Sequence, residues 1–421
     1  MHIAIITAGG AGMFCGSCMH DNSWAKGLRA AGAEVSLLPM YTPIRVDEED
    51  QSLTPVFFGG INCYLNDRFR WWQRVPRILT RWLDSPGIIR RATKGAVSND
   101  AKLLGSMTVS MLRGEEGPHR RACEELIAYV RQLRPDVVCF SNSMLSSTLR
   151  TLKQTFTGRA YCVLQGDDIF LDGLIEPHRS QVMALLRKRV ADFDGFLTHS
   201  TYYRDYMAEY LSQPVSKFHQ LPLAIDCSAH DGRPKSSLGD PPTVGYFARI
   251  CPEKGLDRLV EAVLLLRQRL PNVRLRAGGY LGAQHQAYFD GVCRQAAPLG
   301  DAFEYIGSPE TKAEKIEFLK SLDVFSVPTA YREPKGLYVL EAWANGLPVV
   351  LPRHGAFSEL VESTSGGLLV EPGNSRELAE ALERVLTNEG LRAELAEHGH
   401  AGVRREHDLA SLARATLATL G

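Results

Sequence analysis

Short apolar runs alternate with stretches of helical periodicity in the first half of the chain. The run HIAIITA, residues 2–8, is followed by a helical pattern from Asn22 to Ala31 and then by a second apolar run, AEVSLLPM, residues 33–40. Further apolar runs stand at 135–141, 160–165 and 195–200. Apolar strands that alternate with helices are typical of βαβ units around a parallel sheet. The pattern in the first half therefore predicts a doubly wound, Rossmann-like domain over residues 1–226.

The alternation lapses once and then resumes. Residues 227–242, CSAHDGRPKSSLGDPP, are poor in apolar side chains and rich in Pro, Gly, Ser and Asp, so they predict an interdomain linker. Apolar runs at 243–250, 273–279, 323–329 and 347–352 then alternate with helical patterns, which predicts a second Rossmann-like domain over residues 243–403. An amphipathic helix is predicted over 404–421. Because ligands of open α/β sheets bind outside the carboxyl ends of the strands, the cleft between the two domains is the predicted site.

Composition narrows the class of protein. At 421 residues the chain exceeds what one hydrophobic core usually supports, and its 44% apolar content is ordinary for a globular protein. The 48 basic residues balance 48 acidic ones, which argues against a whole surface built for nucleic acid. No apolar stretch reaches the length of a membrane span, and the first residues do not have the pattern of a signal peptide. The nine scattered cysteines do not form a disulfide framework, so we expect a cytoplasmic protein with reduced thiols.

The most informative stretch is YREPKGLYVLEAWANG, residues 331–346. Pro334 disfavours helix at Glu333, whereas LYVLEAWANG has helical spacing and a glycine stop at Gly346. Glu333 therefore belongs to a loop that leads into a helix, and Glu341 belongs to that helix. We expect the loop to lie over the predicted cleft.

The residues around these two carboxylates suit phosphate and sugar chemistry. Backbone N–H groups at Gly336 and Leu337, at a helix N-terminus beside Lys335, suit a phosphate. Glu333 and Glu341 suit the hydroxyl groups of a sugar and of a ribose, because carboxylates accept hydrogen bonds strongly. The alternative for either glutamate is a solvated charge on a helix face.

A second group of charges supports the same site. In YFARICPEKGLDRLV, residues 246–260, Arg249 ends a predicted strand, and Lys254 with Gly255 starts the next helix. Two cations at that edge can neutralise a diphosphate, Arg through its fork and Lys as a point charge. The alternative is a pair of surface cations that solvate a helix end.

Together with NGLPVV, residues 345–350, and HGAFSELVE, residues 354–362, these motifs resemble the retaining glycosyltransferases of family 4, which have the GT-B fold. The motifs are specific between about residues 243 and 375 and vaguer before 230. The resemblance implies an α/β protein of two Rossmann-like doubly wound domains that face each other across a cleft. It implies a hexosyltransferase of the EC 2.4 class in carbohydrate biosynthesis, with a nucleotide-diphosphate sugar donor in the C-terminal domain. A sugar, lipid-linked or small-molecule acceptor would lie mainly on the N-terminal domain, and no metal or further cofactor would be required.

The resemblance also assigns roles to single residues. The catalytic residues would be Arg249 and Lys254, which would hold the pyrophosphate, and Glu333, which would face the donor sugar. Glu341 would hold the ribose. The departing diphosphate would assist deprotonation of the acceptor, so catalysis would be mostly electrostatic stabilisation and positioning. Lys335 stands where the family often has an aromatic residue, which suggests an added phosphate contact. In this family the C-terminal helix over 404–421 would pack back on the N-terminal domain.

The first glycine-rich loop fits a donor diphosphate better than a dinucleotide. Gly10 and Gly12 match a dinucleotide fingerprint, but Cys15 takes the place of the third glycine, so a nicotinamide enzyme is disfavoured. Small residues at Gly10, Gly12 and Gly16 would instead let the backbone approach the donor diphosphate. Cys15 and Cys18 form a CxxC, which leaves packing, substrate contact, redox chemistry and a metal site open.

Acceptor contacts are expected on the N-terminal domain. Many family members carry a His after a central strand, where this chain reads VLQGDDIF, residues 163–170. The paired aspartates could accept a hydroxyl proton or act as a turn or helix cap. The histidine in LTHSTYY and the polar residues that open the first helix are rivals. The candidate acceptor contacts are His20, Asn22, Gln165, Asp167, Asp168 and His199.

Residues 68–94 hold eight basic residues against Asp84, with Trp71, Trp72 and Trp82 between them. Such a segment suits a lid packed on the core, an anionic lipid surface or a single nucleic-acid strand. We take the segment as the candidate place for peripheral contact with the inner face of a membrane, and we expect no nucleic-acid partner.

Two other functions compete with glycosyl transfer. A sugar-nucleotide epimerase or phosphorylase could use the same architecture without a separate acceptor alcohol. A non-catalytic nucleotide-sugar-binding protein is disfavoured, because Arg249, Lys254, Glu333 and Glu341 occur together.

Overall fold

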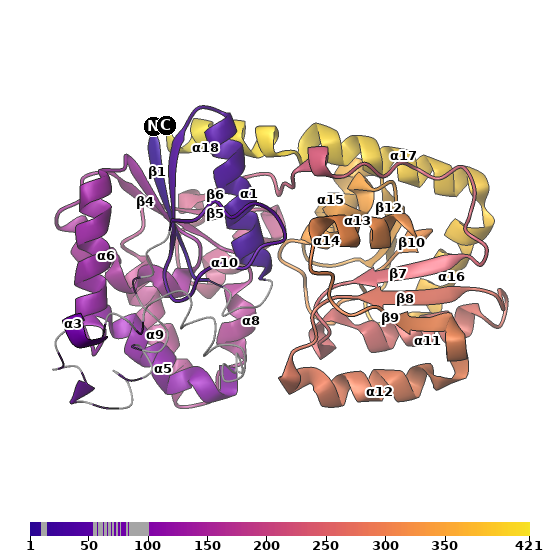
Figure 1. Cartoon of the computed structure of the whole chain (residues 1–421), viewed down its shortest axis with the longest axis horizontal. Coiled ribbons are helices and arrows are strands. Elements are labelled where there is room, and N and C mark those ends of the chain that lie inside the picture. Colours follow the sequence, from indigo (N-terminus) through magenta and orange to yellow (C-terminus); the bar gives the residue numbers. More distant parts are fainter. Residues whose placement is uncertain are drawn as a thin grey trace. The chain divides into compact units, whose positions relative to one another are not determined.

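The computed structural model describes residues 1–9, 15–53, 57, 62, 65, 69, 71, 72, 75, 77–80, 83 and 101–421. These residues form two compact units (Figure 1). The first unit comprises Met1–His199, Tyr203–Leu221 and Leu412–Gly421, and the second comprises Ser200–Tyr202 and Pro222–Ser411. Residues 227–242, whose composition predicts a linker, are counted with the second unit.

The first unit is built on a six-stranded parallel sheet with the strand order β2-β1-β3-β4-β5-β6. All residues of β1 and β3 are buried, because helices cover both faces of such a sheet, and this explains their continuous apolar runs. The strands are β1 (His2–Thr7), β2 (Glu34–Pro39), β3 (Val137–Phe140), β4 (Arg159–Val163), β5 (Gly195–Thr198) and β6 (Phe218–Gln220).

Helices connect the strands of this sheet. Helix α1 begins six residues before the predicted start at Asn22, because Cys15 takes the extended N-cap position. The helices are α1 (Gly16–Ala30), α3 (Arg77–Thr80), α5 (Ala101–Arg113), α6 (Arg120–Leu133), α7 (Leu149–Lys153), α8 (Asp167–Asp172), α9 (His178–Val190) and α10 (Thr201–Tyr210).

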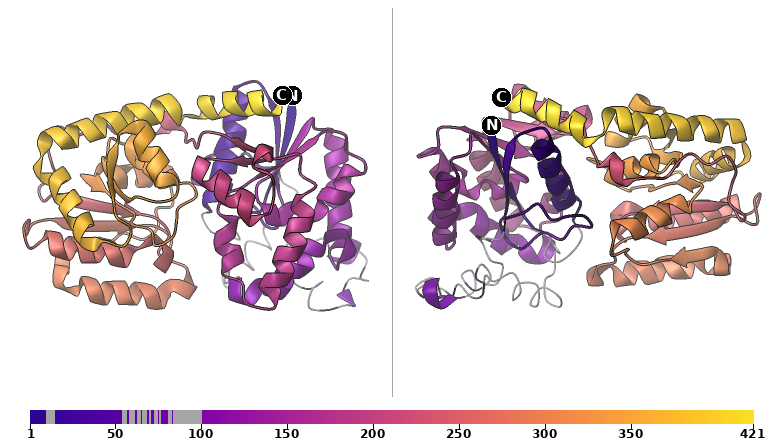
Figure 2. Two further views of the ribbon diagram at one scale, coloured as in Figure 1. Left: turned by 180° about the vertical axis from the view of Figure 1, so that it is seen from behind. Right: turned by 45° about the horizontal axis from the view of Figure 1, so that its top comes forward.

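The end of the chain belongs to the first unit. Helix α18 (Leu409–Leu420) lies alongside α1 (Figure 2), where Trp24 Nε1 donates a hydrogen bond of 3.0 Å to Thr416 Oγ1. Arg159 of β4 donates to the carbonyl oxygen of Gly421 at 2.9 Å. The two termini therefore lie close together in this unit.

The second unit has a six-stranded parallel sheet with the order β12-β11-β10-β7-β8-β9. The central pair is in register at Val244 of β7 and Val324 of β10, both fully buried. The strands are β7 (Thr243–Phe247), β8 (Arg274–Gly278), β9 (Phe303–Tyr305), β10 (Val324–Phe325), β11 (Val349–Pro352) and β12 (Gly367–Val370).

Two groups of helices enclose this sheet (Figure 1). Helices α11 (Leu256–Leu266), α12 (Gln286–Ala296) and α16 (Ser375–Thr387) pack together, and α14 (Leu337–Ala344), α15 (Ala356–Thr364) and α17 (Glu389–Glu406) form the other group. Helix α13 (Lys312–Lys320) precedes β10 and begins with a capping box between Thr311 and Glu314. No helix among the described residues is long and apolar enough to cross a membrane.

Candidate functional site

The predicted donor-site residues of the second unit follow two adjacent strands. Arg249 and Lys254 follow β7, and Glu333 follows β10, its neighbour in the sheet. From β7 the chain builds outward through β8 and β9 and then returns to the other side of β7 with β10. This reversal of strand order is the topological switch point at which open α/β sheets bind ligands.

Two helices begin at glycines beside this switch point. Gly255 is the N-cap of α11 with φ 70°, and a Cβ there would lie 2.1 Å from the carbonyl oxygen of Pro328. Gly336 is the N-cap of α14 with φ 92°, also a left-handed conformation that favours glycine. Both helices start with backbone N–H groups that have no partner inside the helix, so both starts suit an anion.

Lys254 and Glu333 form a buried ion pair at this edge. Lys254 Nζ lies 2.5 Å from Glu333 Oε2, and the two side chains are 8% and 5% exposed. Two tyrosines complete the cluster: the Tyr331 hydroxyl donates to Glu333 Oε2 at 2.8 Å and the Tyr338 hydroxyl at 2.6 Å. Lys254 Nζ also donates to the Tyr331 hydroxyl oxygen at 2.6 Å and lies 5.0 Å from the centre of each tyrosine ring. One carboxylate oxygen thus accepts three hydrogen bonds in a dry environment.

The environment of Glu333 keeps its carboxyl group ionised. Burial alone would raise its pKa, but the Lys254 charge and the hydrogen bonds from Lys254, Tyr338 and Tyr331 lower the pKa to about 2. Burial and the Glu333 charge raise the pKa of both tyrosines well above the usual value. The tyrosines therefore remain protonated donors over the whole physiological pH range.

Arg249 and Lys335 border the same cluster. Arg249 is exposed and follows β7, and its positive charge partly offsets the rise in the pKa of Tyr331 that burial causes. Lys335 is buried, and its backbone N–H points to Glu333 Oε1 at 3.4 Å. The structure thus brings Lys254, Glu333 and Lys335 into contact, and Arg249 follows the adjacent strand β7.

Glu341 has a separate buried partner that the sequence interpretation missed. Glu341 lies in α14, as predicted, and its Oε1 accepts a hydrogen bond of 2.7 Å from Lys315 Nζ of α13. The side chains are 4% exposed for Lys315 and 11% exposed for Glu341. Each of the two glutamates is therefore held by its own buried lysine.

Polar residues also gather at the carboxyl ends of the strands in the first unit. Gln165 after β4 donates to Asp21 of α1 at 2.9 Å, and the rings of His20 and His199 meet edge to face at 4.5 Å. His20 Nδ1 lies 3.5 Å from Asp21 Oδ1. Asp21 is fully buried and was not among the predicted site residues. Four of these polar side chains thus form one group, with Asp21 at its centre.

The other predicted acceptor residues have different partners. Asp167 accepts hydrogen bonds from the backbone N–H and the hydroxyl of Ser143 at 2.7 and 2.6 Å, so it fixes the loop after β3. Asp168 accepts from the Tyr203 hydroxyl at 2.6 Å, and burial raises its pKa to about 6. Asn22 binds the segment at 48–51, through Glu48, the carbonyl of Glu49 and the N–H of Gln51.

Parts of the first loop lie outside the described residues, among them Gly10 and Gly12. Gly16 begins α1, and a Cβ there would meet no atom within 4 Å, so no described neighbour requires a glycine at that position. Cys15 and Cys18 stand at the start of the same helix. The pKa of Cys18 is raised well above its usual value by a hydrogen bond with Cys15 and by burial. Among the described residues, no group of three or more His, Cys, Asp and Glu side chains is arranged to hold a metal ion.

Most of residues 68–94 also lie outside the described residues, including Trp82. Phe69 is 41% exposed and Trp71 is 61% exposed, and their rings lie 6.2 Å apart. Trp72 donates to Asn62 at 3.2 Å. The exposed pair Phe69 and Trp71 is thus followed by Trp72, which is hydrogen-bonded to Asn62.

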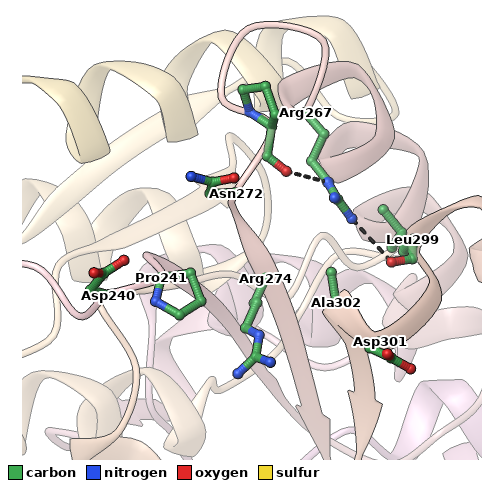
Figure 3. A pocket seen from close by; sticks show the side chains of 9 residues that line it. Asp240, Pro241, Arg267, Asn272, Arg274, Leu299, Asp301 and Ala302 are labelled. Atoms are coloured by element: carbon green, nitrogen blue, oxygen red, sulfur yellow. Dashed lines mark hydrogen bonds between the residues drawn. The ribbon is translucent and has the colours of Figure 1, made fainter.

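A surface hollow of about 460 Å³ lies at the opposite edge of the second sheet (Figure 3). Arg267 does not face a ligand there, because it donates to the carbonyl oxygens of Pro271 and Leu299 at 2.8 and 3.1 Å. The hollow stands at the amino ends of the strands, away from the switch-point residues. Its lining comprises Asp240, Pro241, Arg267, Pro271, Asn272, Arg274, Leu299, Asp301 and Ala302.

Part of the second unit matches a known family model. Residues 230–401 match the family model for glycosyl transferases group 1. A lipopolysaccharide core biosynthesis glycosyltransferase of Rhizobium meliloti is 32% identical over 163 residues, which are 38% of this chain and 44% of that protein. The match thus spans less than half the length of this relative.

Solved structures of low identity match the chain over its whole length. A sucrose-phosphate synthase from Thermosynechococcus elongatus has a TM-score of 0.72 at 17% identity and covers 100% of this chain and 98% of its own. The Anabaena protein HepE, in complex with UDP and glucose, has a TM-score of 0.67 at 16% identity and covers 99% of this chain and 98% of its own. At such identities the likeness is one of fold. The predicted two-domain α/β architecture is confirmed: the chain has the GT-B fold, and its residues 230–401 match the family model for glycosyl transferases group 1.

Proposed function

We propose that this protein is a hexosyltransferase that moves a sugar from a nucleotide-diphosphate donor to a hydroxyl group of an acceptor. The observation that carries the proposal is the buried Lys254–Glu333 pair at the switch point between β7 and β10, with Glu341 on the helix that follows. HepE, which shares the fold, is described in complex with UDP and glucose, which supports a nucleotide-sugar donor for this chain.

Within the described part of the chain, Lys254 Nζ uses two of its three N–H groups, which leaves one for the donor. An ammonium group carries three N–H bonds, and two of them are directed to Glu333 Oε2 and to the Tyr331 hydroxyl. The third can reach a phosphate oxygen while the ion pair stays intact. Lys254 would thereby stabilise the negative charge that develops on the departing diphosphate.

Arg249 and the two helix starts would share this charge. The exposed guanidinium of Arg249 can turn to the diphosphate, and backbone N–H groups in the first turns of α11 and α14 can bind its oxygens. In α11 the Asp257 N–H is already engaged, because it donates to the Tyr288 hydroxyl at 3.2 Å. Since these groups carry positive charge or partial positive charge, the diphosphate could be neutralised without a metal ion. We therefore propose a reaction that requires no metal.

Glu333 would bind the donor sugar through its other oxygen. Oε2 accepts three hydrogen bonds, whereas from the described residues Oε1 receives only the long contact from the Lys335 N–H at 3.4 Å. Oε1 can therefore accept a hydrogen bond from a sugar hydroxyl. Its carboxylate has a low pKa and is locked by neighbours, so it suits orientation better than nucleophilic attack. Assisted departure of the diphosphate on one face would retain the configuration at the anomeric carbon.

The first unit would supply the acceptor side. The buried group around Asp21, with His20, Gln165 and His199, lies at the carboxyl edge of its sheet, where hydroxyl-bearing ligands of open sheets bind. The exposed pair Phe69 and Trp71, in a segment rich in basic residues, suits a lipid-linked acceptor at an anionic membrane surface.

The proposal is tested by incubating the protein with UDP-, GDP- and ADP-sugars and a panel of sugar and lipid-linked acceptors. We expect one donor to release nucleoside diphosphate only when an acceptor is present, with activity unchanged by EDTA. Proton NMR of the product should show the anomeric configuration of the donor. Release of free sugar phosphate, or conversion of the donor without an acceptor, would instead indicate a phosphorylase or an epimerase.

A further inference from the structure

The Lys315–Glu341 pair stands apart from the Lys254–Glu333 cluster. Lys315 lies on α13, the helix before β10, and Glu341 lies on α14, the helix after it. The residues are 3% and 9% exposed, and Lys315 Nζ donates to Glu341 Oε1 at 2.7 Å. Both charges are therefore buried on the helices that flank β10, one of the two strands of the switch point.

The pair leaves one carboxylate oxygen for a ligand. Lys315 occupies Oε1 of Glu341, and in the described part of the chain Oε2 makes no hydrogen bond. The Glu341 side chain keeps 11% of its surface exposed, against 4% for Lys315, and Oε2 is not among the buried polar atoms that lack a partner. The Lys315 ammonium group binds one carboxylate oxygen of Glu341, so a ligand would donate its hydrogen bond to the other oxygen, Oε2.

The surroundings hold the pair in place from the other side. Asn345 Nδ2 donates to the backbone carbonyl of Glu341 and lies 2.9 Å from His230 Nδ1. Both Asn345 and His230 are buried. Burial keeps His230 uncharged, and the cations Lys312 and Lys315 add to this effect on its pKa. Glu341 is thus paired with the cation Lys315, whereas the nearby His230 is neutral.

We propose that Lys315 is a positioning residue for ribose recognition: it holds the Glu341 side chain turned so that Oε2 accepts a hydrogen bond from a hydroxyl of the donor's ribose. This inference rests on the proposed function, in which Glu341 binds the ribose of the nucleotide-sugar donor. A nucleoside diphosphate with a complete ribose diol is the ligand class that such an oxygen recognises. A deoxyribose analogue lacks the donor hydroxyl and leaves the oxygen unpaired.

The test compares ribose discrimination in the wild type and in Lys315→Met. Calorimetry measures the affinity for the nucleoside diphosphate that binds the wild type, and for its 2′-deoxy and 3′-deoxy analogues. We expect the wild type to bind at least one analogue about 10-fold or more weakly, because a hydrogen bond to a charged acceptor is lost. In Lys315→Met the ratio of the analogue's dissociation constant to that of the complete nucleotide should fall towards one, and the analogue's own affinity should stay nearly unchanged. The donor KM should rise while kcat at saturating donor stays within about 3-fold.

Matched variants separate positioning from structural damage. Lys320→Met removes a lysine of the same helix that pairs with Glu317 at the surface, and it should keep the wild-type ratio. If Lys315→Met does not fold, Lys315→Gln, which removes the charge and keeps a polar side chain beside Glu341, replaces it and should show the same loss. A folded Lys315 variant with the wild-type ratio would overturn the inference and leave the proposed function intact. If no nucleoside diphosphate binds the wild type, both are wrong.

Discussion

The Tyr338 hydroxyl should contribute measurably to stability because it serves a buried charge. It donates to Glu333 Oε2 at 2.6 Å, and Glu333 is 4% exposed. Tyr338→Phe keeps the ring, and with it the contact to Lys254 at 5.0 Å, and removes only the donor. A hydrogen bond to a charged group contributes about 1.5–3 kcal/mol, which is the loss of unfolding free energy that we expect. For a domain of this size it corresponds to a midpoint lower by roughly 3–12 °C.

A second tyrosine of the same unit provides the control. The Tyr305 hydroxyl donates to the backbone carbonyl of Gly279 at 2.7 Å, so its partner is neutral. Tyr305→Phe should cost only about 0.5–1.5 kcal/mol. Thermal unfolding of both variants without ligand, followed by circular dichroism, measures the difference. If Tyr338→Phe loses no more stability than Tyr305→Phe, then Glu333 does not depend on its tyrosine donors and the reasoning about this cluster is refuted.

Three further outcomes are expected. Lys254→Met should lower kcat by roughly 10- to 100-fold and change donor affinity less, because the third N–H acts on developing charge; steady-state kinetics with calorimetry would reveal the opposite split. Burial lowers the pKa of His230 to about 3, so between pH 6.5 and pH 3 the imidazole is protonated in the unfolded state but not in the folded state. The free energy of unfolding should therefore fall as pH falls below about 6.5, by roughly 2 kcal/mol at pH 5. Urea unfolding at pH 7 and pH 5 should show a smaller loss for His230→Gln than for the wild type, and equal losses would contradict this. The protein should sediment with anionic vesicles but not with neutral ones, and the triple change of Trp71, Trp72 and Trp82 to Ala should weaken this; if the intact protein stays in solution, the membrane contact is wrong.

Much of the architecture and part of the site could be predicted from the sequence. Alternating apolar runs indicate both parallel sheets, and Pro334 with Gly336 correctly places Glu333 in a loop and Glu341 in a helix. These features depend on residues close together in the chain, where backbone preferences decide the local conformation.

The missed residues depend on contacts that no local pattern encodes. Lys315 meets Glu341 across 26 residues, and Gln165 meets Asp21 across 144. Tyr338 lies only five residues from Glu333, but its hydroxyl reaches the carboxylate because the left-handed turn at Gly336 folds the helix start back over the loop. A signal was present for Asp21, since an acid on the apolar face of a helix needs a reason to be buried.

The fate of Asp167 shows the same limit from the other side. Its position after a strand and a glycine suggested an acceptor contact, with a structural role as the alternative. Both hydrogen bonds from Ser143 go to one of its oxygens, so the structure gives it a partner in the loop after β3. Sequence alone cannot rank these roles, because the deciding partner lies on another strand's loop.

The most direct test of the account is calorimetric titration of UDP, GDP and ADP into the wild type, Glu341→Gln and Glu380→Gln. Glu380 is an exposed glutamate of α16 in the same unit and serves as the matched control. We expect one nucleotide to bind the wild type and Glu380→Gln equally well, and to bind Glu341→Gln about 10-fold or more weakly. Failure of all three nucleotides to bind the wild type, or equal affinity in Glu341→Gln, would contradict a nucleotide-sugar site at the switch point of the second sheet.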